Sequence, residues 1–70
     1  MTNFLNTDPN LSDYDDTYQM IIDMHLDLTE SESVSTNAKL ILALVNHIGD
    51  SNVVREAVDI ARENTLKWRN

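Results

Sequence analysis

Hydrophobic side chains recur at helical spacing in three segments of the chain. The pattern predicts helices over residues 12–27, 30–48 and 51–67. Residues 1–11 are rich in turn-forming side chains and have no period, which indicates a flexible N-terminal tail. Ser12 precedes three aspartates and is the expected N-cap of the first helix.

The stretch from Asn37 to Asp50 is apolar on almost every side of the predicted second helix. A helix with that character has to be covered by neighbouring elements. We therefore expect this helix to be central, with the other two packed against it. The sequence predicts an all-α fold, a three-helix up-down-up bundle forming a single domain over residues 12–70.

The helix boundaries carry local signals. Thr29 and Glu32 have the spacing of a capping box, so the second helix should follow the first with almost no loop and lie antiparallel to it. Gly49 is the only glycine of the chain and directly follows an apolar run, which is typical of a helix C-cap. Asp50 or Ser51 should then cap the third helix.

The composition limits the size of the core and the class of protein. A chain of 70 residues buries a modest share of its surface, and the absence of cysteine excludes disulfides and thiol chemistry. Self-association or a larger partner is then a natural source of stability. The N-terminus lacks signal-peptide features, and the longest apolar run, residues 40–45, is too short for a membrane span. We expect a cytoplasmic protein without a membrane partner.

Acidic residues are concentrated in the first half of the chain. Residues 1–32 carry eight acids and no lysine or arginine, whereas residues 33–70 have a net charge of +1. Such a surface repels phosphate groups, which argues against nucleic acid and anionic lipid as partners. The acids either attract a basic protein or simply keep a small protein soluble.

Two polar side chains, His25 and Asn37, fall within the predicted apolar stripes, and Tyr18 is a candidate hydrogen-bond partner for them. His25 projects between two tyrosines of the first helix, one of them Tyr18, and Asn37 projects into the apolar arc of the second. Each needs a partner if buried, because an unsatisfied buried donor or acceptor costs about 1–3 kcal/mol. One hypothesis is a structural network that fixes helix register, and the other is a small-ligand or metal site using His25 and Asn37.

A candidate interaction surface contains Asn46, His47 and Asp50 near the second turn, with Leu66 and Trp68 at the chain end. Asn46 projects to the polar side, so core packing does not require it. His47 is either a pH-sensitive helix cap or a solvent-facing side chain. Trp68 is either a binding anchor or a residue that closes the core against the N-terminal tail.

Enzymatic signatures are absent from the sequence. It contains no HExxH, no glycine-rich phosphate loop and no nucleophile elbow. The basic residues of the third helix lie towards its end, whereas a DNA-reading helix uses its start. We therefore expect no catalytic residue, no cofactor and no nucleic-acid partner.

One block of the sequence resembles a family of short, mainly proteobacterial proteins classed as a domain of unknown function. The resemblance spans residues 18–62, with lysine at position 39 where arginine is expected. Its specific part is the run Asn37-Ala38-x-Leu40-x-Leu42-x-Leu44-x-Asn46-His47-Ile48-Gly49-Asp50. The resemblance brings no assigned activity; it implies an accessory role beside a flavin-dependent oxidoreductase of aromatic catabolism. We thus expect a non-enzymatic module that binds a larger cytoplasmic protein or a second copy of itself.

Overall fold

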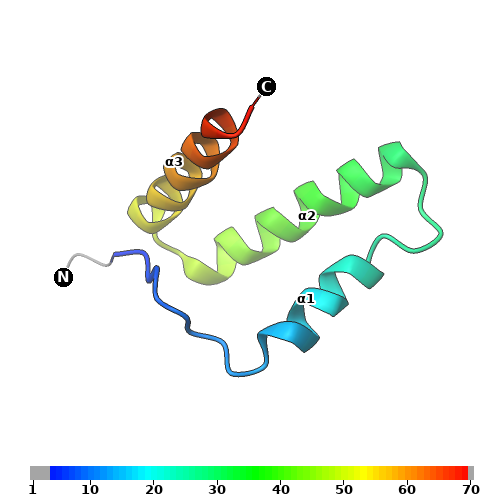
Figure 1. Cartoon of the computed structure of the whole chain (residues 1–70), viewed down its shortest axis with the longest axis horizontal. Helices are drawn as coiled ribbons and strands as arrows, with labels where there is room; N and C mark the ends of the chain where they lie inside the picture. The colour runs from blue at the N-terminus through cyan, green and yellow to red at the C-terminus, as the bar shows by residue number, and fades with distance from the viewer. Residues whose placement is uncertain (1–3, 70) are drawn as a thin grey trace.

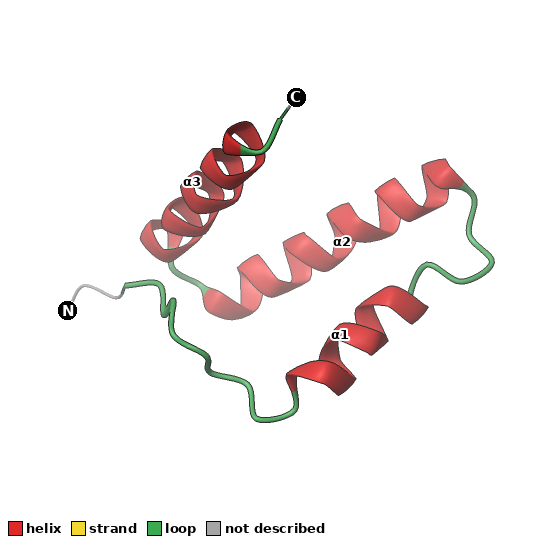
Figure 2. Cartoon of the chain, viewed as in Figure 1, coloured by secondary structure: helices red, strands yellow, loops and turns green. Residues whose placement is uncertain are grey.

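The computed structural model describes residues 4–69, which contain three helices and no strand (Figures 1 and 2). Helix α1 spans Tyr14–Asp23, α2 spans Glu30–Ile48 and α3 spans Ser51–Lys67. Figure 1 shows α1 and α2 running in opposite directions, with α3 rising from the far end of α2. The predicted all-α, three-helix arrangement is therefore confirmed. Residues 4–13 precede α1 without helix or strand.

The predicted bounds hold for α2 and α3, but the first helix is shorter than the expected 12–27. Its N-cap is Asp13 rather than Ser12, and Asp13 makes no side-chain capping bond. At the other end, the N–H groups of His25 and Leu26 donate to carbonyls three residues back, both at 3.1 Å, which tightens the chain into turns. Asp27 then has a φ of 62°, a conformation that ends a helix and that aspartate tolerates.

Side-chain caps define the two later helices. The Glu32 N–H donates to Thr29 Oγ1 at 3.2 Å, and the Thr29 N–H donates to Glu32 Oε1 at 2.9 Å, which completes the predicted capping box. Asp50 caps α3, because its Oδ1 accepts from the N–H groups of Asn52 at 2.9 Å and Val53 at 3.3 Å. The start of each helix is thus specified locally.

Gly49 ends α2 with a φ of 66° and permits the chain to enter α3 within two residues. A Cβ at this position would approach the Asn46 carbonyl oxygen at 3.8 Å, which is an ordinary contact. The conformation itself, rather than a clash, therefore selects glycine.

Replacing Gly49 with alanine is expected to lower the free energy of unfolding by about 1 kcal/mol, the strain of a left-handed alanine. Urea unfolding at a fixed chain concentration measures this loss. Gly49→Asn is the control, since asparagine adopts the conformation more readily. Equal stability of the alanine variant and the parent chain would contradict the assignment.

The three helices form an open arrangement. The radius of gyration is 14.1 Å, against about 11 Å for a compact domain of this length. Among the described helices, α2 and α3 are the only pair whose Cα atoms approach within 8 Å. No described residue is buried. The expectation that neighbours within the chain cover the stretch from Asn37 to Asp50 is therefore wrong, because periodicity cannot specify whether the covering helix belongs to the same chain.

Candidate interaction surface

The inner faces of α2 and α3 line a groove that is apolar along its length. Each helix supplies four lining residues, and these recur at helical spacing. Each helix therefore presents a single apolar stripe to the groove. The lining residues are Ile41, Leu44, Val45, Ile48, Val54, Ala57, Val58 and Ala61. We call this surface the α2–α3 groove. Because its lining residues are accessible to solvent, it is an apolar surface that no element within residues 4–69 covers.

A polar corner adjoins the groove where α2 turns into α3. Asn46, Gly49, Asp50 and Ser51 line a hollow there, together with two valines that also line the groove. Asp50 is occupied in capping α3, so its first role is structural. The structure thus places two of the predicted contact residues, Asn46 and Asp50, at one end of the groove.

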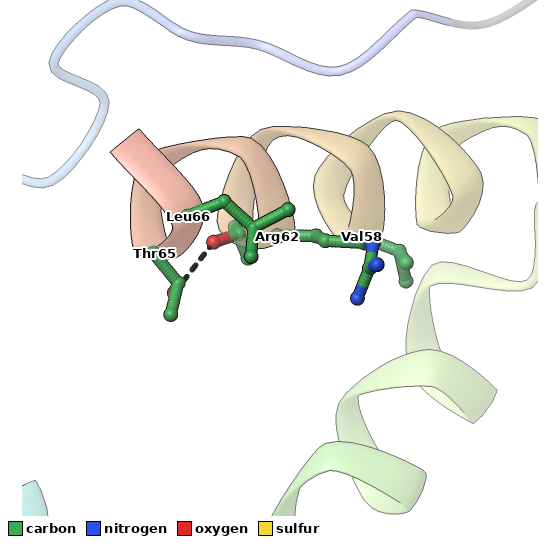
Figure 3. Close-up of a pocket in the computed structure, with 5 residues that line it drawn as sticks. Val58, Arg62, Thr65 and Leu66 are labelled. Carbon is green, nitrogen blue, oxygen red and sulfur yellow. Dashed lines mark hydrogen bonds between the residues drawn. The ribbon is translucent and has the colours of Figure 1, made fainter. Parts of the chain in front are cut away.

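A second hollow lies farther along α3 and shares part of its lining with the groove (Figure 3). Val58 and Ala61 line both the groove and this hollow, which also contains Arg62, Thr65 and Leu66. The Thr65 hydroxyl donates to the Ala61 carbonyl oxygen at 2.9 Å, which satisfies it within the helix. Arg62 shares this hollow with two groove residues, so it brings a positive charge to the groove margin. Leu66, which is 40% exposed, extends the apolar surface along α3.

The remaining two predicted contact residues lie apart from the groove. Trp68 is 75% exposed and lines a different hollow of α3 with Ile60. Lys67 Nζ lies 6.0 Å from the centroid of the Trp68 ring, at the limit of a cation–π contact. His47 is exposed on α2 and lines neither the groove nor the corner. The predicted surface is thus divided among separate parts of the molecule.

The predicted buried polar group is not assembled in the single chain. Asn37 is exposed on α2, and Tyr18 is 69% exposed on α1. This corrects their expected burial, and the reason is that no helix covers either stripe. His25 is half-buried in the turn after α1, and its Nδ1 atom has no hydrogen-bond partner within the described chain.

Within residues 4–69, no three or more histidine, aspartate or glutamate side chains are grouped so that they could hold a metal ion. Over the same range, no helix has the length and apolar character needed to cross a membrane.

Helix α1 presents a second uncovered apolar stripe. Its members are Tyr14, Tyr18, Ile21 and Ile22, and all four are exposed. Acidic side chains lie elsewhere on the same helix, with Asp15 and Asp16 in its first turn. The α1 stripe is therefore an amphipathic surface with an acidic surround, and it contacts neither of the other helices.

Sequence periodicity identified the groove residues but assigned them to a core. The signal that could have distinguished the two is size: a chain this short has few residues with which to cover a helix that is apolar all round. The missed site is the groove itself, rather than any polar residue.

The sequence model of a protein family described as a protein of unknown function, DUF2783, matches residues 5–63. This chain belongs to the DUF2783 family. The match covers most of the DUF2783 chain, including all of α1 and α2, and confirms the resemblance to a domain of unknown function. The signature from Asn37 to Asp50 and the proteobacterial origin stay predictions. No curated protein matches the DUF2783 chain at a significant level, and no solved structure does either.

Proposed function

We propose that this DUF2783 chain is a non-enzymatic protein-interaction module whose α2–α3 groove binds an amphipathic helix. The observation that carries the proposal is the groove itself, eight apolar residues on two helices with no covering element. Apolar grooves between helices are a recurring receptor for the apolar face of a helix. The expected occupant has apolar side chains at positions i, i+3, i+4 and i+7.

Charge at the groove margin adds a preference for the occupant. Arg62 lies beside the groove wall, so an acidic flank on the bound helix is favoured over a basic one. Asn46 at the corner offers an amide that can donate to the end of a bound helix or accept from it. Trp68 and His47 lie away from this surface and are not expected to contribute to binding at the groove.

The experiment is a capture of bound protein from the native cell lysate, using tagged parent chain and two variants of α3. Val58→Asn places a polar side chain in the groove, whereas Ile60→Asn makes a comparable change on another side of the same helix. We expect stoichiometric protein, either a separate species or untagged chain, with the parent and with Ile60→Asn. Capture should fall at least tenfold with Val58→Asn.

The capture also bears on the accessory role expected from the sequence resemblance. That role would be specified if a flavin-dependent oxidoreductase is captured by the parent chain and by Ile60→Asn but not by Val58→Asn. Capture that is equal for Val58→Asn and Ile60→Asn, or that is absent with a strictly monomeric parent chain, would contradict the proposal.

A further inference from the structure

We propose that the occupant of the α2–α3 groove is helix α1 of a second copy of the same chain, so that two copies exchange α1 reciprocally. The inference rests on the proposed function, because it identifies the partner helix of the same groove. It is carried by four independent properties of the chain: area, length, charge and the path of the α1–α2 connection.

The exposed area is too large for a completed monomer. The chain exposes 6604 Å², whereas a compact monomer of 8.0 kDa exposes about 4,500 Å². The excess is about 2,100 Å². The residues before α1, if fully extended, account for at most roughly 1,300 Å² of this excess, which is their extended area less their share of a compact surface. Roughly 800 Å² per chain remain, which is about the area that one partner contributes to a standard stable interface.

The length of α1 matches the length of the groove. Helix α1 has 10 residues, which corresponds to about 15 Å. The lining residues extend from Ile41 to Ile48 on α2 and from Val54 to Ala61 on α3, each about 12 Å long. A helix of this length therefore covers the groove without a large overhang.

The charges of α1 and of the groove margin are opposite. Residues 1–32, which include α1, contain eight acidic residues and no lysine or arginine. Arg62 lies at the groove wall, and Asp15 is next to the stripe that contains Tyr18 when α1 is projected at 100° per residue. An α1 helix in the groove would thus bury its apolar stripe and bring part of its acidic flank near Arg62.

The path of the chain directs α1 away from its own groove. In Figure 1, α1 and α3 lie on opposite sides of α2, and the described α1 contacts neither helix. The connection is held by local hydrogen bonds, including Leu28 N–H to the His25 carbonyl oxygen at 3.2 Å and the capping box at Thr29. Each copy therefore presents one free stripe and one free groove, and a two-fold pair satisfies both at once.

Chemical cross-linking tests the exchange directly, because the described chain has no free cysteine and the sequence contains none. Thr17 lies halfway along α1, beside the edge of the stripe formed by Ile21 and Tyr14, and Ala57 is near the middle of the groove; each is replaced by cysteine. Central positions keep the pair within reach of a short bismaleimide whichever way α1 runs along the groove. The two single-cysteine chains are mixed, one carrying a tag, and treated with the linker.

We expect a covalent heterodimer between Thr17→Cys and Ala57→Cys at a yield at least tenfold above the control mixture. The control replaces Thr17→Cys with Asp16→Cys, an exposed residue on the face of α1 opposite the centre of the stripe. In the mixture each chain has one cysteine, so a link between the two sites must join two chains. The double variant Thr17→Cys/Ala57→Cys has both cysteines in one chain, so a link within that chain appears as a cross-linked monomer.

Equal yields from the two mixtures would overturn the exchange, as would a double variant that links only within itself. If groove-dependent capture from lysate persists in that case, the proposed interaction function stands with another occupant. If the capture is also independent of the groove, both proposals fail.

Discussion

Replacing Leu44 with asparagine is expected to convert a dimer into a monomer. Leu44 lines the groove and is 52% exposed in the single chain, so α1 of the second copy in the proposed dimer would cover the exposed half of the side chain. Losing that burial and desolvating an amide instead cost about 2 kcal/mol per copy. The substitution occurs twice in a two-fold dimer, which gives about 4 kcal/mol and roughly a thousandfold rise in Kd.

Leu42 supplies a matched control for this substitution. It is 67% exposed, lies two residues away on α2 and does not line the groove. Residues two apart on a helix point in nearly opposite directions, so Leu42→Asn changes the same atoms on another face. Sedimentation equilibrium gives both dissociation constants, and circular dichroism checks that the helix content is unchanged. Equal weakening by the two substitutions would exclude the groove as the interface.

The second large effect is expected on α1. Tyr18→Ser removes a ring from the stripe that would enter the partner's groove in the proposed dimer, and buried tyrosine is a frequent anchor of interfaces. We expect Kd for self-association to rise about a hundredfold or more, because each lost ring contributes about 1.5 kcal/mol and two are lost per dimer. The same sedimentation measurement reports this change.

Met20→Ser is the control for Tyr18→Ser. Both side chains are 69% exposed in the single chain, and two positions along the helix separate them. A projection at 100° per residue places Met20 outside the stripe. A loss of association that is as large for Met20→Ser as for Tyr18→Ser would show that α1 contributes only general hydrophobicity.

The sequence predicted the helices well because their ends are determined locally. The capping box at Thr29, the lone Gly49 and the Asp50 cap each specify a boundary through neighbours within a few residues. The first helix was overestimated because the residues after Asp23 continue the helical period, while their backbone tightens into turns and becomes left-handed at Asp27. A pattern of hydrophobic residues does not specify the backbone conformation at such a turn.

The groove could be predicted only in part. The hydrophobic pattern indicated that the helix containing the stretch from Asn37 to Asp50 needs cover, but we assigned that cover to the same chain. The choice between one chain and two depends on the path between α1 and α2, which local hydrogen bonds set rather than a hydrophobic period. His25 and Asn37 show the same limit, since their expected burial required a packed α1 that the single chain does not provide.

The most direct test of the central claim is an isotope-filtered nuclear Overhauser experiment on an equal mixture of labelled and unlabelled chains. The chain has two tyrosines, so their ring signals are readily assigned. We predict intermolecular contacts between the Tyr18 ring of one copy and the methyl groups of Ala57, Val58 and Ala61 of the other. Finding these contacts only within single molecules, or finding none in a monomeric chain, would contradict it.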